Sequence, residues 1–241
     1  MIIIRTIYFY TIVVLSLCIA PITLIKINYL KRKGKLEERT KLIHKITHKR
    51  AKFVMKLNGS KITVNGFENI PTNETVLFVS NHQGYFDIPL LMSIIDIPHG
   101  FIAKKELEKI PGISMWMRYI NCIFMDRENM RKSATAIVEG IKLLRGGYSM
   151  VIFPEGTRSK GNTVAEFKAG SMKLATKSKC PIIPVTIDGS YKLLESHNGK
   201  IGKAPNTVTF HKAIDATNLS KDELNELHNT VKNIVTSSLN K

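Results

Sequence analysis

The stretch TVLFVSNHQGYFDIPLLMSII, residues 75–95, moves from a strand pattern through a polar loop into a helix pattern. Its apolar run at residues 76–79 predicts a buried strand, and His82 follows just beyond the C-terminal end of that strand. The segment DIPLLMSII then predicts a helix with Asp87 as its N-cap. Ligands of open α/β sheets bind beyond the carboxyl ends of the strands, so the loop at residues 80–87 is a candidate site.

Similar β-rich runs occur on either side of this stretch, bounded by Gly, Pro, Asn or Ser. They are KITVNGF (61–67), YSMVIF (148–153), PIIPVTI (181–187) and TVTFHKA (207–213). Helical patterns lie between them at residues 88–95, 131–144 and 168–178, and Ser220 with Glu223 has the capping-box spacing of a final helix. Strands that alternate with helices predict an α/β fold with a mixed, mainly parallel sheet flanked by helices. We assign this fold to residues 59–241 and an N-terminal membrane-associated helical region to residues 1–58.

The segment IYFYTIVVLSLCIAPITLI, residues 7–25, contains no charged side chain. As one helix it would be about 28 Å long, close to the hydrocarbon thickness of a bilayer. Five cationic residues follow at positions 26–35 and no small-residue cleavage site is evident, so we expect an uncleaved anchor rather than a signal peptide. The excess of positive charge places the domain that follows on the cytoplasmic side of the cell membrane. Pro21 leaves open whether the segment spans the bilayer or enters it and returns.

Residues 39–57, RTKLIHKITHKRAKFVMKL, have two faces when arranged as a helix. Leu42, Ile46, Phe53 and Leu57 fall on one side and five lysines on the other, which predicts a basic amphipathic helix. We favour a position at an anionic membrane surface, because a membrane anchor precedes the segment. The alternative is a surface helix whose apolar stripe packs on the domain.

The chain carries a formal net charge of +17, which attracts polyanions. Nucleic acid, anionic lipid surfaces and phosphorylated small molecules are therefore all partners to consider. Much of the charge lies beside the apolar N-terminal segment, and no nucleic-acid-binding motif occurs, so we expect no nucleic-acid partner. Cys18, Cys122 and Cys180 are widely spaced and form no CxxC pair, which indicates reduced, structural thiols.

Two interpretations of His82 and Asp87 remain open from these residues alone. In the first, Asp87 only caps a helix and His82 fills the loop. In the second, the carboxylate orients the imidazole and stabilises its cation, which lets His82 take a proton from an attacking hydroxyl.

A second polar loop follows another predicted strand, in VIFPEGTRSKGN at residues 151–162. Gly156 would let the backbone approach a ligand, Arg158 offers a planar fork suited to phosphate, and Thr157 is a further donor. The simpler interpretation is an ordinary turn with an ion pair between Glu155 and Arg158.

A third stretch, AKKELEKIPGISMWMRYINCIFMDR at residues 103–127, has cations at both ends: Lys104, Lys105 and Arg127. Its apolar middle could wall a hydrophobic slot, but we expect it to be core.

Taken in order, NHQGYFD, AKKELEKIPGI…IFMDR, FPEGTRS and PIIPVTI resemble the four sequence blocks of the glycerolipid acyltransferases. They are most similar to the bacterial 1-acyl-glycerol-3-phosphate (lysophosphatidate) acyltransferases, and the resemblance covers roughly residues 60–215. Asn121 stands where that family usually has glycine; asparagine tolerates a left-handed backbone, so the turn can be retained.

The resemblance implies that His82 is the general base for the free hydroxyl of lysophosphatidate, with Asp87 orienting it. The activated oxygen would attack an acyl thioester, either acyl-CoA or acyl-acyl-carrier protein, and give phosphatidate with no metal or other cofactor. Glycerol phosphate would be bound by Glu155, Gly156, Thr157 and Arg158, with positive charge added by Lys104, Lys105 and Arg127.

Two alternatives to this function remain. One is the same chemistry on another acceptor, namely glycerol-3-phosphate, a lysophospholipid or a lyso-aminolipid. The other is a non-catalytic membrane or lipid-binding protein built on the same fold. Anionic membrane lipids are expected partners of the enzyme.

Overall fold

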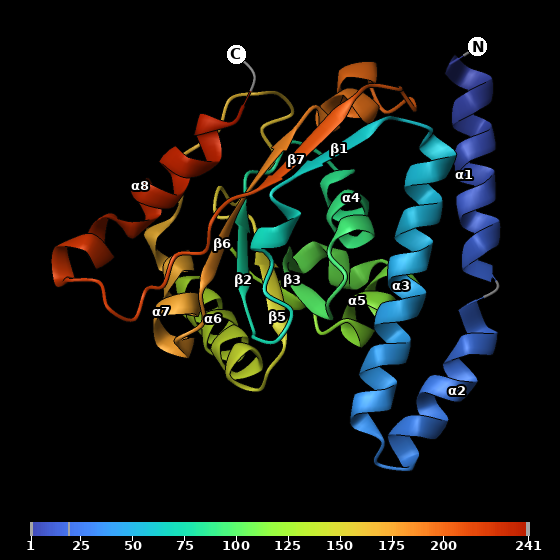
Figure 1. Cartoon of the computed structure of the whole chain (residues 1–241). Helices are drawn as coiled ribbons and strands as arrows, with labels where there is room; N and C mark the ends of the chain where they lie inside the picture. Colours follow the sequence, from blue (N-terminus) through green and yellow to red (C-terminus); the bar gives the residue numbers. More distant parts are fainter. Residues whose placement is uncertain (1, 19, 240–241) are drawn as a thin grey trace.

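The computed structural model describes residues 2–18 and 20–239, and this part of the chain contains one seven-stranded sheet (Figure 1). The strand order is β1-β7-β6-β2-β5-β3-β4. The strands are β1 (Ile62–Asn65), β2 (Leu77–Ser80), β3 (His99–Lys104), β4 (Ile123–Met125), β5 (Ser149–Ile152), β6 (Ile182–Asp188) and β7 (Asn206–Phe210). Neighbouring strands pair in parallel except β6 with β7. The predicted mixed, mainly parallel sheet is confirmed.

Helices cover both faces of the sheet. They are α1 (Ile2–Cys18), α2 (Ala20–Arg32), α3 (Leu36–Asn58), α4 (Asp87–Ile94), α5 (Ile113–Tyr119), α6 (Met130–Arg145), α7 (Lys173–Ser178) and α8 (Lys221–Ser237). Side chains of β2 alternate between two cores. Phe78 belongs to the core that includes α3, α4 and α5, whereas Leu77 and Val79 belong to the core that includes α6, α7 and α8. The buried strand β2 thus lies in the middle layer of three.

Every strand predicted from the sequence is present, but β3 and β4 were missed. β3 opens with His99 and Gly100, which do not resemble a strand start. A Cβ at Gly100 would lie 2.6 Å from the carbonyl oxygen of Ile120, so only glycine allows this close approach of the two backbones. Asn121 has φ 52°, the left-handed conformation expected of it.

The final helix has the predicted capping box. The Ser220 side chain accepts a hydrogen bond from the Glu223 N–H, and the Glu223 side chain accepts one from the Ser220 N–H. The middle of the third stretch is largely core, as expected, with Trp116, Ile120 and Ile123 buried.

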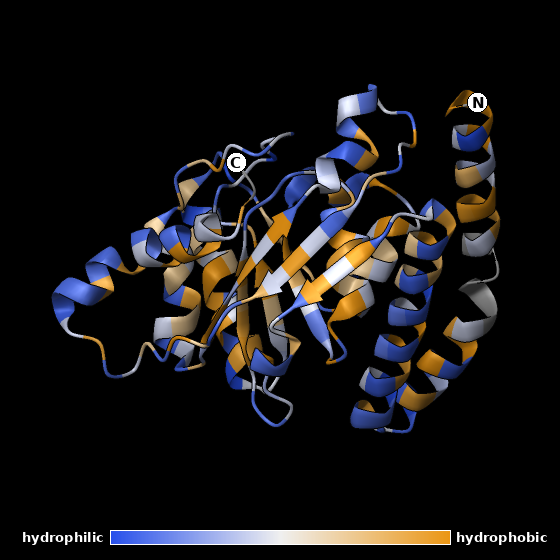
Figure 2. Cartoon of the chain, turned by 45° about the horizontal axis from the view of Figure 1, so that its top comes forward, coloured by the Kyte–Doolittle hydropathy of each residue, from blue (hydrophilic) through white to orange (hydrophobic). Residues whose placement is uncertain are grey.

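The interpretation of the amphipathic helix has to be corrected. Ile43 and Met55 on α3 are buried in the same core as α4, and Leu42, Ile46 and Leu57 pack partly against it. The lysines lie on the outer face of the helix, which Figure 2 shows as predominantly hydrophilic. Apart from Phe53, which is 43% exposed, the apolar stripe of α3 therefore packs on the domain instead of facing a membrane, and this core crosses the boundary predicted at residue 58.

The uncharged N-terminal segment is divided between α1 and α2, which are joined through residue 19, outside the described residues. The side chains of Cys18 and Pro21 also lie outside the described part. Of the helices described, none is both long enough and apolar enough to cross a bilayer.

Helix α1 lies beside α3 and contacts the domain (Figure 1). Arg5 donates a hydrogen bond to the Asn58 carbonyl, and the rings of Phe9 and Phe86 lie 5.8 Å apart. Other side chains of α1 and α2 are exposed, including Ile4 (74%), Ile7 (62%) and Ile25 (74%). This N-terminal pair of helices therefore has one side packed on the protein and an apolar side open to the surroundings.

Candidate active site

Three loops meet where the adjacent parallel strands β5, β2 and β6 end. Strand β2 lies between the other two, so the loops at residues 81–86, 153–162 and 189–195 leave the same edge of the sheet. The carboxyl edge of such a sheet is where ligands bind in this fold class. Both polar loops singled out in the sequence are at this edge.

His82 and Asp87 form a direct hydrogen-bonded pair. Nδ1 of His82 lies 2.6 Å from Oδ2 of Asp87, and the imidazole stacks on the Phe153 ring with 4.1 Å between ring centroids. An ionised carboxylate can only accept, so Nδ1 carries the proton and Nε2 carries the lone pair. Asp87 therefore holds the imidazole in one orientation, which is the contact that the second of the two interpretations requires.

Asp87 is not the N-cap of α4. Phe86 occupies that position and Asp87 is the first helical residue. Its fully buried carboxylate turns back to the loop, where Oδ2 also accepts the N–H groups of Gln83 (2.7 Å) and Gly84 (3.0 Å). Oδ1 accepts the hydroxyl of Ser190, which follows β6. The prediction that Asp87 is the N-cap was wrong by one residue. Its carboxylate accepts N–H groups of the preceding loop instead of N–H groups in the first turn of α4.

Glu155 connects the His82 loop to the segment that follows β5. Its Oε1 accepts the N–H of His82 (2.6 Å) and its Oε2 accepts the N–H of Ala165 (2.8 Å). Burial raises the pKa of this carboxyl group, and the two backbone N–H groups partly oppose that rise. Both oxygens are thus used within the protein, which does not fit the expectation that Glu155 contacts a bound phosphate.

Arg158 does not pair with Glu155 either; its partner is Glu195. Nη1 of Arg158 lies 3.3 Å from Oε1 of Glu195, and the guanidinium carbon lies 3.6 Å from the centre of the Tyr85 ring. The Glu195 side chain is only 6% exposed, and its Oε1 also accepts the N–H of Tyr85. The arginine is therefore held on two sides, with 25% of its side chain still accessible.

Two further cations border Gly156, which has φ 76°. Arg127 donates to the Gly156 carbonyl, and Nζ of Lys168 lies 3.0 Å from the place where a Cβ on Gly156 would sit. Thr157 is exposed beside them. The structure thus brings Arg127 to the loop at residues 155–158, as expected.

Lys104 and Lys105 make their ion pairs elsewhere. Nζ of Lys104 lies 3.3 Å from Glu106, and Nζ of Lys105 lies 2.9 Å from Asp126. Among the described residues, neither lysine makes a hydrogen bond or ion pair with the loop at residues 155–158. Lys105 lies near Arg127, since its partner Asp126 precedes Arg127 in the chain, and both lysines are already paired with carboxylates.

Comparison with known proteins identifies the family of this chain. Residues 61–188, more than half of the chain, match the family described as Acyltransferase. The chain belongs to the acyltransferase family. A 1-acyl-sn-glycerol-3-phosphate acyltransferase from Borreliella burgdorferi is 32% identical over 183 residues, which are 76% of this chain and 73% of the relative. A probable enzyme of the same description from Mycoplasma genitalium is 32% identical over 195 residues, 76% of this chain and 72% of the relative.

The fold of this acyltransferase also has a close counterpart among solved structures. The crystal structure of PlsC, the 1-acyl-sn-glycerophosphate (LPA) acyltransferase from Thermotoga maritima, matches with a TM-score of 0.85 at 31% sequence identity. The match covers 98% of this chain and 93% of that chain. It therefore includes the N-terminal helices as well as the sheet.

Sequence reasoning missed four side chains at this candidate site: Gln83, Lys168, Ser190 and Glu195. Gln83 Oε1 accepts the N–H of Gly189 at 2.9 Å, so it joins the loop after β2 to the loop after β6. The sequence signal for Ser190 and Glu195 is their position after PIIPVTI, because a third adjacent parallel strand also ends at this edge.

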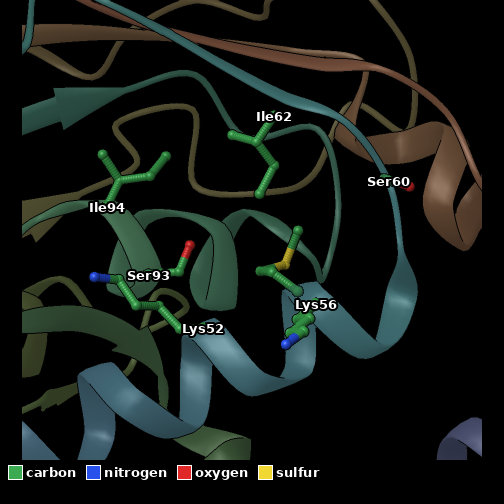
Figure 3. Close-up of a pocket in the computed structure, with 7 residues that line it drawn as sticks. Lys52, Lys56, Ser60, Ile62, Ser93 and Ile94 are labelled. Atoms are coloured by element: carbon green, nitrogen blue, oxygen red, sulfur yellow. The ribbon is translucent and has the colours of Figure 1, made fainter.

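A pocket elsewhere on the acyltransferase is not part of this site. It opens between α3, β1 and the C-terminal part of α4 (Figure 3). It is lined by Lys52, Met55, Lys56, Ser60, Ile62, Ser93 and Ile94. Asp87 is at the other end of α4, and none of the side chains around His82 lines this pocket.

Proposed function

We propose that this acyltransferase moves a fatty acyl group from an acyl thioester to the free hydroxyl of 1-acyl-sn-glycerol-3-phosphate and so forms phosphatidate for phospholipid synthesis. The names of the relatives support the substrates. The observation that carries the chemistry is the 2.6 Å contact between His82 Nδ1 and Asp87 Oδ2. It leaves one imidazole nitrogen able to accept a proton.

In this mechanism His82 Nε2 takes the proton of the acceptor hydroxyl as its oxygen attacks the thioester carbonyl. The carbon–sulfur bond then breaks, and the imidazolium returns the proton to the leaving thiolate. Asp87 stabilises the cation between these steps. A positioned base contributes typically about 10²- to 10⁴-fold to the rate, and the orientation of the two substrates supplies much of the rest. Acyl-CoA or acyl-acyl-carrier protein serves as co-substrate, and this polar transfer requires no further cofactor.

The acceptor phosphate would be bound by Arg158, with Thr157 as a hydroxyl donor and Gly156 allowing close backbone approach. Arg127 and Lys168, which border Gly156, would add positive charge. Lys104 and Lys105 would contribute only at longer range. In place of the contact expected of Glu155, we assign it the role of holding the His82 loop in position.

We further propose that α1 and α2 rest on the cytoplasmic face of the cell membrane. Their exposed isoleucines suit the apolar boundary of a leaflet, and the cationic residues at positions 26–35 suit anionic headgroups. An acceptor with a fatty acyl chain is itself a membrane component, so this position is consistent with the reaction.

The test is acyl transfer by the purified protein in vesicles. Lysophosphatidate, glycerol-3-phosphate and lysophosphatidylcholine are offered side by side with each thioester donor, and His82→Ala is the control. Phosphatidate formed from lysophosphatidate, and lost in the variant, is the expected result. Transfer to a different acceptor would reassign the substrate, and no transfer from a folded protein would favour a lipid-binding role.

A further inference from the structure

A cluster of possible metal ligands lies outside the acyltransferase site, between α3 and the end of α4. His44 and His48 are four residues apart on α3, so they project from the same face of the helix. Asp96 follows α4, and its Oδ1 lies 3.2 Å from Nε2 of His44 and 3.6 Å from Nε2 of His48. One ligand atom from each residue lies within 4.8 Å of the others.

His48 is already oriented as a ligand would be. Its Nδ1 lies 2.8 Å from the carbonyl oxygen of Met92, which can only accept, so the proton is on Nδ1 and the lone pair on Nε2. The His48 side chain is 9% exposed, and in the described structure its buried Nε2 has no hydrogen-bond partner. A buried acceptor without a donor is costly, whereas a bound cation would satisfy it. This arrangement, a ring fixed by a backbone carbonyl at one nitrogen, is the usual support of a metal-binding histidine.

The surroundings of the cluster also favour a cation. The carbonyl groups at the C-terminal end of α4 give that end a partial negative charge. The Asp96 side chain is 70% exposed, so an ion can reach the cluster from solvent without opening the core.

We propose that His44, His48 and Asp96 bind one divalent ion of the Zn²⁺ type, with water in the fourth position. Tetrahedral zinc with ligands near 2.0 Å requires ligand atoms about 3.3 Å apart, close to the two distances to Asp96. Two imidazoles favour zinc over Mg²⁺ or Ca²⁺, which prefer oxygen ligands.

The ion would fasten α3 to α4 and so hold the N-terminal helices on the domain. It would take no part in acyl transfer, because Asp87 is at the opposite end of α4, about 10 Å away along the helix. The inference therefore does not depend on the proposed reaction.

The experiment is a titration of the full chain, stripped of metal, with Zn²⁺ in competition with a chromophoric chelator. We expect one equivalent to bind to the wild-type protein, and at least tenfold weaker binding in Asp96→Asn and His44→Gln. Asp96 is exposed, so its variant tests the site without removing core packing. His228→Asn, a histidine on α8 outside the cluster, should bind as the wild type does, and Mg²⁺ should not compete.

Thermal unfolding gives a second, independent readout. Zinc should raise Tm of the wild-type protein and of His228→Asn but not of Asp96→Asn. Equal zinc affinity in the wild type and both cluster variants would overturn the proposal, as would the absence of stoichiometric binding or equal competition by Mg²⁺.

Discussion

Ser190 donates a hydrogen bond to Oδ1 of Asp87, the carboxylate oxygen that His82 does not use. Asp87 is fully buried, and His82 together with the N–H groups of Gln83 and Gly84 occupies its other oxygen. Ser190 follows β6 and His82 follows β2, so one carboxylate joins the ends of two adjacent strands. The orientation of the imidazole therefore depends on a residue more than a hundred positions further along the chain.

Replacing this hydroxyl in Ser190→Ala should lower kcat while leaving KM for both substrates nearly unchanged. A hydrogen bond to a charged group contributes about 1.5–3 kcal/mol, and the loss of part of this in the transition state gives about a tenfold lower kcat. Steady-state kinetics on vesicles measures the effect. Ser190→Thr keeps the hydroxyl and should restore most of the rate. Ser93→Ala removes a buried serine hydroxyl from α4 and is the matched control; an equal loss there would mean that the effect is structural.

Arg158→Ala should raise KM for the acceptor by about tenfold to a hundredfold, the range expected for a charge-assisted hydrogen bond. The donor KM should change little, because the proposed partner of the guanidinium is the acceptor phosphate. Arg158→Lys keeps the charge but loses the stacking on Tyr85, so its effect should be intermediate. Arg145→Ala, whose guanidinium contacts only the Lys177 carbonyl in the described structure, should behave as the wild type. A selective rise in the donor KM would contradict the assignment.

Glu195→Gln should change the acceptor KM in the opposite direction. Glu195 neutralises Arg158 in the structure, and an amide can still accept the Tyr85 N–H without offsetting the positive charge. Acceptor binding should therefore become several-fold tighter, measured as a lower KM for lysophosphatidate. A higher KM would mean instead that Glu195 is needed to hold the arginine in its binding position.

Glu155→Gln should lower both stability and kcat. An amide nitrogen cannot accept the backbone N–H that one carboxylate oxygen now satisfies, and a buried group left unpaired costs about 1–3 kcal/mol. Urea unfolding and steady-state kinetics measure the two losses. Glu166→Gln is the matched control, because that side chain is 81% exposed and its ion pair with Lys232 contributes little. Unchanged kcat in Glu155→Gln would mean that this carboxylate is not needed to hold the His82 loop in position.

The membrane position of α1 and α2 can be tested with the combined substitutions Ile4→Ser, Ile7→Ser and Ile25→Ser. Fully burying an isoleucine side chain contributes about 1.5–3 kcal/mol, so vesicle binding should weaken by tenfold or more while the fold is retained. Flotation with anionic vesicles measures this. Val138→Ser with Leu224→Ser removes exposed apolar side chains from α6 and α8 and should have no effect. An equal loss of vesicle binding in the two sets of variants would mean that α1 and α2 do not provide the membrane contact.

The sequence was sufficient for the fold where strands are apolar and bounded by turn residues, as in β2, β5 and β6. It was insufficient where tertiary contacts decide the structure. β3 was missed because the approach of the residue 120 backbone, which requires Gly100, becomes visible only in three dimensions. The apolar stripe on α3 was predicted to face a membrane because an apolar helix face has the same pattern whether lipid or protein covers it.

At the site, the spacing of His82 and Asp87 after a strand end left two interpretations open, and the resemblance to the glycerolipid acyltransferases favoured the contact that the structure shows. The partner of Arg158 could not. Glu155 was three residues away and of opposite charge, yet it is buried and accepts backbone N–H groups, while Glu195 reaches the guanidinium from a different strand connection. Local spacing cannot distinguish a carboxylate that accepts backbone N–H groups from one that pairs with a side chain.

The contact between Phe9 and Phe86 places α1 next to the loop that holds His82 and Asp87, since Phe86 precedes Asp87 in the chain. With α1 resting in a leaflet, an acceptor would arrive by lateral diffusion, with its acyl tail still among the lipids. Turnover would then follow the two-dimensional density of acceptor within the bilayer rather than its concentration in water. Diluting the acceptor with inert lipid would slow such an enzyme even when the total amount of acceptor is constant.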